Sequence, residues 1–138
     1  MKKTILLISI LVFTFVYANA QQQSKKTDEN INAPEIKFET TVHDYGTIPL
    51  NGDGNCEFKF TNTGKEPLIL SNVRSSCGCT VPKWPKDPIL PGKSNSIIVK
   101  YNTHRAGIIN RQVTVNSNAK IHTIVLHIKG KVANKASE

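Results

Sequence analysis

The chain has 138 residues, a formal net charge of +8, 38% hydrophobic residues and 20% charged residues. These values are typical of an ordinary globular protein, and they exclude a collagen-like, coiled-coil or wholly disordered chain. The length allows a single domain and therefore excludes a two-domain cofactor enzyme.

The N-terminus has the pattern of a targeting segment. Lys2 and Lys3 precede an apolar run over residues 5–17, and Ala18-Asn19-Ala20 provides the small residues that signal peptidase requires. The run is shorter than the roughly 20 residues of a membrane-spanning helix. We therefore predict a signal peptide over residues 1–20, no transmembrane segment after cleavage, and a periplasmic or secreted protein. Gln21 follows the cut, which argues against a lipid-anchored cysteine there.

Residues 21–34 are polar and contain few apolar side chains, so we predict a disordered leader. Residues 133–138 form a similar tail. The folded unit is expected to cover residues 35–132.

Alternating apolar residues dominate that unit. Cys56, Phe58 and Phe60 share one face of a predicted strand, and other alternating groups occur at Ile97, Val99 and Tyr101, at Val113 and Val115, and at Ile124, Leu126 and Ile128. Asn and Gly at residues 51–54 predict a hairpin turn, and four prolines between Pro82 and Pro91 exclude a helix or a central strand. About seven short strands predict an all-β fold, a single antiparallel β-sandwich.

Five segments resemble, in order, a bacterial family called domain of unknown function 1573. They are His43-Asp44-Tyr45-Gly46-Thr47-Ile48, Phe58 to Lys65, Ser76-Cys77-Gly78-Cys79-Thr80, Pro91-Gly92-Lys93 and Ser117-Asn118-Ala119. The resemblance covers about residues 36–132. It implies an Ig-like sandwich, related to major-sperm-protein and cilia-associated modules, and an exported protein with no known activity. Cys56 departs from the family, where an ordinary apolar residue is expected.

Cys77-Gly78-Cys79 is the sharpest local feature, and four states are open to it. The two cysteines form a strained and therefore oxidising bridge that Gly78 allows by bending, or one of them pairs with Cys56. Alternatively both are buried structural thiols, or both bind a soft metal such as Cu(I), because alternate residues of a strand share a face. No second Cys or His pair supplies the spacing of a zinc site.

Two further residues are candidates for binding. His43 begins the His-Asp-Tyr-Gly segment, where it is either a ligand or base, or part of a hydrogen-bonded turn in which Tyr45 packs and Gly46 takes a special backbone conformation. Trp84 lies in a proline-stiffened stretch, where it either contacts a partner or covers an end of the sandwich.

No nucleophile elbow, phosphate loop or paired-carboxylate pattern occurs, so we predict no enzyme activity and no catalytic residue. The basic residues suggest a positive surface, but export and the lack of interleaved aromatics argue against nucleic acid. This surface would comprise Arg74, Lys83, Lys86, Lys93, Lys100, Arg105 and Arg111.

The first functional hypothesis is therefore a non-enzymatic Ig-like module that binds a protein or an envelope component and carries no cofactor. Its contacts would run through a sheet edge or through the loops of Cys77-Gly78-Cys79 and Trp84. The alternative is a periplasmic thiol-redox or copper-binding protein that uses Cys77 and Cys79.

Overall fold

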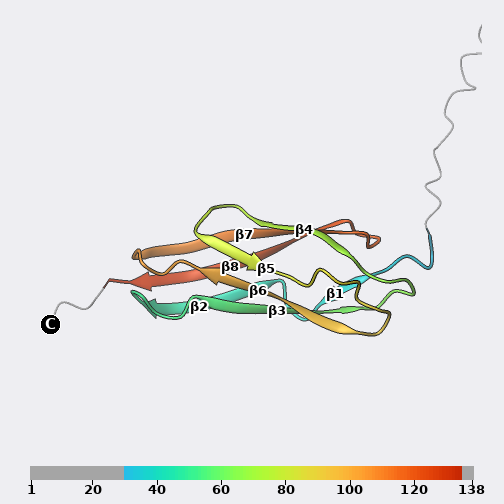
Figure 1. Ribbon diagram of the computed structural model, residues 1–138. Coiled ribbons are helices and arrows are strands. Elements are labelled where there is room, and N and C mark those ends of the chain that lie inside the picture. Colours follow the sequence, from blue (N-terminus) through green and yellow to red (C-terminus); the bar gives the residue numbers. More distant parts are fainter. Residues whose placement is uncertain (1–29, 135–138) are drawn as a thin grey trace, which may run out of the picture.

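The computed structural model describes residues 30–134, which form eight strands in two packed sheets (Figure 1). One sheet has the order β1 (Ile36–Phe38), β3 (Asn55–Asn62), β6 (Ser94–Tyr101) and β5 (Thr80–Lys83). The other has the order β2 (Val42–Pro49), β8 (Thr123–Ala133), β7 (Gly107–Ser117) and β4 (Leu70–Ser75). The predicted all-β sandwich is confirmed, with one strand more than expected.

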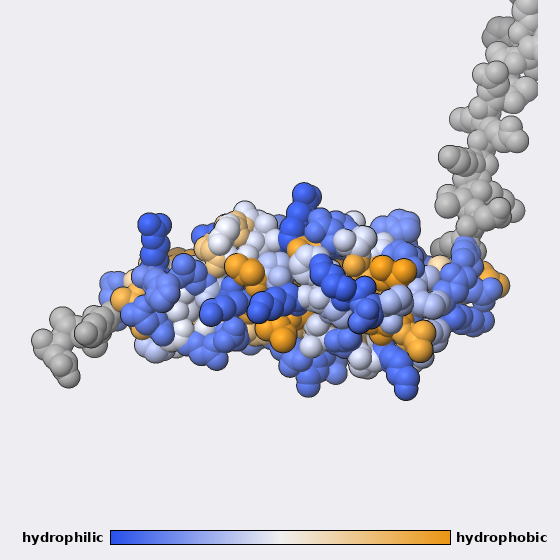
Figure 2. All heavy atoms as spheres, viewed as in Figure 1, coloured by the Kyte–Doolittle hydropathy of each residue, from blue (hydrophilic) through white to orange (hydrophobic). Residues whose placement is uncertain are grey.

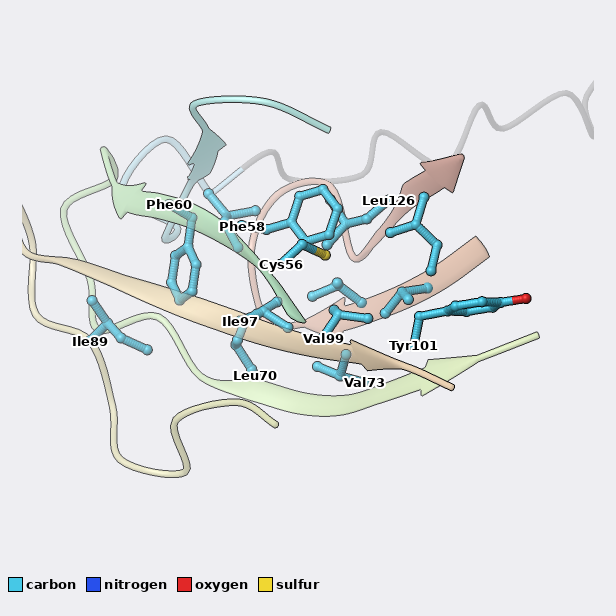
Figure 3. Close-up of a cluster of buried hydrophobic side chains, with 14 of the residues drawn as sticks. Cys56, Phe58, Phe60, Leu70, Val73, Ile89, Ile97, Val99, Tyr101 and Leu126 are labelled. Carbon is cyan, nitrogen blue, oxygen red and sulfur yellow. The ribbon is translucent and has the colours of Figure 1, made fainter. Parts of the chain in front are cut away.

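The core lies between the sheets and is built from the alternating residues that the sequence indicates. Phe58, Phe60, Val99 and Leu126 are completely buried, and the close-up in Figure 3 shows their side chains in one cluster. In β3, the polar neighbours Glu57 and Lys59 are exposed to solvent. Each fully buried Phe or Leu stabilises the fold by roughly 1.5–3 kcal/mol. On the face shown in Figure 2, hydrophilic side chains surround several small hydrophobic patches.

The predicted hairpin at residues 51–54 is wrong. A tight turn does form there, because Gly52 donates its N–H to the carbonyl of Pro49 and Asn51 has a φ of 62°. However, within residues 30–134 β2 pairs only with β8, whereas β3 pairs with β1 and β6, so the turn carries the chain from one sheet to the other. Turn residues specify where a chain reverses but not which strands then pair.

The sheets are also not wholly antiparallel. β2 runs parallel to β8, and the register begins with Val42 opposite His127. All the other strand pairs are antiparallel. The prolines behave as expected, because β5, which contains Pro82, is an edge strand.

The structured part begins before residue 35. Pro34 is buried, its carbonyl accepts a hydrogen bond from the N–H of Lys120, and Asn30 donates its side-chain amide to Glu66. Residues 30–34 of the predicted leader therefore contact the domain. The predicted signal peptide, residues 21–29 of the leader, and residues 135–138 lie outside the described residues. Within residues 30–134, no helix is long and apolar enough to cross a membrane.

Candidate binding site at the Cys77–Cys79 end

The His-Asp-Tyr-Gly segment forms an irregular step in β2. The register against β8 shifts between Asp44 and Thr47, and Gly46 there has a φ of 60°. Asp44 accepts a hydrogen bond from the N–H of Gly46 at 2.8 Å and forms an ion pair with Lys129 at 3.4 Å. The Gly46 N–H and Lys129 together hold the pKa of the Asp44 carboxyl below its usual value. The Asp44 carboxylate thus stabilises the backbone of this register shift, which we call the bulge.

The side chains of Tyr45 and His43 pack beneath this irregular part of β2. The Tyr45 hydroxyl donates to the carbonyl of Gly54 at 2.7 Å, and burial raises the pKa of the phenol. His43 is half-buried and packs edge-on against Tyr45, with 4.5 Å between ring centroids. Gly130 of β8 faces the bulge, where a Cβ would lie only 2.9 Å from Tyr45 and from Gly46. These packing contacts give His43 a structural surrounding rather than a ligand set.

Three other segments of the family resemblance, residues 58–65, 91–93 and 117–119, meet at one end of the sandwich. We call this the asparagine end, and it is centred on Asn62, Gly64 and Asn118. The Asn62 side chain is fully buried, and it donates to the carbonyls of Glu66 and Ile89 at 2.8 and 2.9 Å. Its oxygen accepts from the N–H groups of Gly64 and Glu35. Asn118 in turn accepts from the Ile69 N–H and donates to the Pro67 carbonyl.

The remaining segment, around Cys77, forms the loop between β4 and β5 at the opposite end. A disulfide joins Cys77 to Cys79, with 5.3 Å between their Cα atoms, so the structure adopts the first of the four open states. The Ser75 hydroxyl donates to the carbonyls of Cys77 and Thr80. The Cys79 carbonyl accepts from the N–H of Asn102. These bonds fix the loop across the two sheets, while Gly78 at its tip stays exposed.

Arg111 lies beside this disulfide. It follows the same alternation on β7 as the buried Val113 and Val115, so its side chain enters the space between the sheets. Its Nε lies 3.4 Å from the Sγ of Cys79, and its Nη1 donates to the carbonyl of Asn110. A half-buried guanidinium carries a desolvation cost that a sulfur and a carbonyl offset only in part.

A hollow of about 600 Å³ opens next to Arg111 and the disulfide. Its lining includes Cys79, Tyr101, Arg105 and the exposed Ile108, and no acidic residue of the described part of the chain lines it. In Figure 3 the hydroxyl of Tyr101 points away from the core cluster at one of its ends. We call this region the cysteine end, defined by residues 77–79, 101–108 and Arg111.

The structure brings only some of the predicted site residues together. Cys79 and Gly78 line the hollow, whereas His43 and Trp84 do not. Trp84 is half-buried against the core, and Lys86 lies over its ring at 3.2 Å from the centroid. Cys56 is buried and free, and burial raises the pKa of its thiol. Within residues 30–134, no three His, Cys, Asp or Glu side chains are placed to hold a metal ion.

The sequence pattern indicates Arg105 and Arg111 only as members of a general basic surface. A signal for Arg111 was available, because a charged residue at an inward position of a strand is unusual. Nothing in the local pattern places Arg105 or Tyr101 beside the cysteines, since that proximity depends on the strand order.

A family model described as "Protein of unknown function (DUF1573)" matches residues 36–132. The chain belongs to this family. The predicted resemblance is therefore confirmed, and the family's description assigns no activity. No curated protein matches the chain.

Solved structures show the same fold at low sequence identity. A protein of unknown function from Porphyromonas gingivalis W83 is 16% identical with a TM-score of 0.61, over 72% of this chain and 47% of that one. PapD-like domain 7 of human CEP192 is 7% identical with a TM-score of 0.64, over 75% and 89%. The secreted serine protease VesC from Vibrio cholerae is 14% identical with a TM-score of 0.57, over 80% and 25%.

These likenesses support the Ig-like, PapD-like class of sandwich and nothing finer. The DUF1573 chain spans about half the length of the Porphyromonas protein and a quarter of VesC. Whatever the rest of those proteins does is not carried over with the fold.

Proposed function

We propose that this DUF1573 protein is an exported, non-enzymatic module that binds a protein of the cell envelope through the cysteine end. The observation that carries the proposal is the hollow lined by Cys79, Tyr101, Arg105 and Arg111, in which two cationic side chains meet no carboxylate of residues 30–134. Arg and Tyr are, with Trp, the residues that contribute most often to binding energy at interfaces. The other four family segments are occupied with holding the fold together.

Two observations support export. The N-terminal residues have the pattern of a signal peptide, and the Cys77–Cys79 disulfide persists only where thiols are not kept reduced. Fractionation of cells expressing the full chain tests this part. We expect the mature protein outside the cytosol with a mass that begins at Gln21. A cytosolic protein that retains Met1 would contradict it.

A pull-down from envelope extract tests the binding function. The mature protein is immobilised beside a variant with Arg105→Gln and Arg111→Gln, and bound proteins are compared at several salt concentrations. We expect at least one protein retained by the wild type and lost with the double variant, because the cationic pair provides the contact. Recovery of nothing above background at every salt concentration would reject the proposal.

A second candidate function is thiol–disulfide exchange, favoured by the position of Arg111 at 3.4 Å from Cys79 Sγ. A substrate thiolate would attack Cys77 Sγ, the Cys77–Cys79 bond would break, and Cys79 would leave as a thiolate beside the guanidinium. A second thiolate of the substrate would then release Cys77, so that the substrate gains a disulfide and the protein keeps two thiols. After such reduction, the two sulfurs would also suit Cu(I).

The double variant Cys77→Ser and Cys79→Ser tests this second candidate. We expect loss of exchange with a dithiol peptide, and loss of Cu(I) uptake by the reduced protein, while the β-type circular dichroism and the melting temperature stay nearly unchanged. If the variant unfolds, the disulfide is structural and the candidate fails. Exchange at the wild-type rate would equally exclude it.

A further inference from the structure

β7 has unequal neighbours along its length. β8 pairs with it from Gly107 onward, whereas β4 begins to pair only at Val113, opposite Ser75. The N–H of Ser76 still bonds to the Gln112 carbonyl before the chain turns away into the Cys77–Cys79 loop. Figure 1 shows β7 and β8 running on past this β4–β5 loop. Within residues 30–134, no strand borders residues 107–111 of β7 on the β4 side, so they form a sheet edge there.

The alternation of an antiparallel ladder identifies the groups at this edge. Since the carbonyl of Gln112 faces β4, the backbone N–H and C=O of Asn110 and Ile108 point to the same side. The Asn110 carbonyl is used by the side chain of Arg111. Ile108 has 77% of its surface exposed and lines the hollow. Its backbone N–H and C=O therefore lie where a continuation of β4 would have paired with them. Such an edge is a template for another strand.

The charges beside the edge are all of one sign. Arg105 and Arg111 line the adjoining hollow, and none of its lining residues is acidic. In the part of the chain that the structure describes, the one ion pair joins Lys129 to Asp44 in β2. Guanidinium groups bind carboxylates through paired hydrogen bonds, and the second terminal nitrogen of Arg111 makes no bond within residues 30–134.

We propose that the segment Ile108–Asn110 of β7 accepts an extended, acidic peptide as an additional strand, whose carboxylates bind Arg105 and Arg111 in the hollow beside Cys79. This inference rests on the proposed binding function and names the chemistry of its partner. The backbone of the peptide pairs with the open edge, and its alternate side chains enter the hollow. A volume of about 600 Å³ is sufficient for those side chains.

The test uses the mature protein and a fluorescein-labelled nine-residue peptide in which Asp and Val alternate. Binding is followed by fluorescence anisotropy at low salt. We expect Arg105→Gln and Arg111→Gln each to weaken binding about tenfold, because each removes a charge-assisted contact. Arg74→Gln is the matched control, since Arg74 is an exposed residue of β4 that does not line the hollow, and it should bind as the wild type does.

A second peptide separates strand addition from charge attraction. It has the same sequence, but its Val residues carry N-methyl groups that remove the backbone donors. We expect this peptide to lose most of its binding while its charge is unchanged. Hydrogen exchange should show that the Ile108 amide becomes protected when the unmodified peptide binds, while the Asn116 amide does not change.

Several results would overturn the inference. Equal binding of the N-methylated peptide, or no effect of Arg105→Gln, would exclude it, and Arg105 is exposed, so its variant is expected to fold. If inorganic phosphate competes fully and binds as well as the peptide, the hollow is a small oxyanion site. If light scattering shows a dimer that the peptide fails to dissociate, a second copy occupies the edge. A successful pull-down with a failed peptide would reject this inference alone, whereas peptide binding with an empty pull-down would reject the envelope partner.

Discussion

The two ends of the sandwich treat their polar groups in opposite ways. At the asparagine end, the buried Asn62 side chain makes four hydrogen bonds to backbone groups. At the cysteine end, the half-buried Arg111 bonds, among the residues that the structure describes, only to a sulfur and a carbonyl, and none of those residues brings a carboxylate to the hollow beside it. Buried polar groups in proteins normally have hydrogen-bond partners. We therefore expect another molecule to bind at the end where guanidinium donors lack such partners within residues 30–134.

The strongest test of this comparison is Asn62→Ala. The change leaves buried backbone carbonyls and N–H groups without partners, and we expect it to lower the free energy of unfolding by about 3 kcal/mol. Urea unfolding followed by circular dichroism measures the loss. Asn72→Ala, at an exposed position of β4, is the control and should change little. A loss below about 1 kcal/mol for Asn62→Ala would mean that the network is dispensable.

A second test compares Gly130, which faces the β2 bulge, with Gly78 at the cysteine end. Gly130 has a φ of 146°, and a Cβ there would meet Tyr45 and the carbonyl of Gly46 at 2.9 Å. We expect Gly130→Ala to cost about 2 kcal/mol of stability. Gly78 at the cysteine end has open space around its Cβ position, so Gly78→Ala should be nearly neutral. Similar melting temperatures for both variants would show that the bulge adapts.

Alkaline pH provides a third and smaller test, directed at the core. Burial raises the pKa of Cys56, so the folded protein keeps its thiol protonated where the unfolded chain releases the proton. The stabilisation is complete below the unfolded pKa of about 8.5 and is lost as pH rises above it. Urea unfolding between pH 7 and pH 9.5 should show this decline. Cys56→Ala should flatten it, and an equal decline in that variant would assign the effect to other groups.

The smallest expected effect is that of Arg111→Gln on stability. Its contacts are a sulfur and a carbonyl, so we expect a change of less than about 1 kcal/mol, in contrast to Asn62→Ala. The melting temperature in calorimetry measures it. A large drop in melting temperature would mean that Arg111 stabilises the cysteine end and is not available to bind a partner.

The local sequence predicts much of the fold, because apolar and polar residues alternate along the strands. Cys56, Phe58 and Phe60 are all buried as expected, and so are Ile97, Val99 and Tyr101. The pairing of the strands is a different matter. A turn at residues 51–54 is correctly located but joins two sheets, because pairing depends on contacts made far along the chain.

The candidate site shows the same division. Cys77, Gly78 and Cys79 stand out in the sequence; Gly78 and Cys79 line the hollow, and Cys77 is joined to Cys79 by the disulfide. Arg111 reaches Cys79 only because β4 and β7 are neighbours in the second sheet and the chain then crosses to β5. His43 and Trp84 were equally prominent in the sequence, yet they pack onto Tyr45 and the core.

The parallel pairing of β2 with β8 sets an order of assembly. Val42, near the beginning of the domain, has its partner in His127 on the last strand. Translation from the N-terminus therefore delivers one half of this ladder long before the other, and contacts so distant along a chain close slowly. The second sheet thus cannot gain β2 as its border strand until β8 has been synthesised, long after the strands of the first sheet.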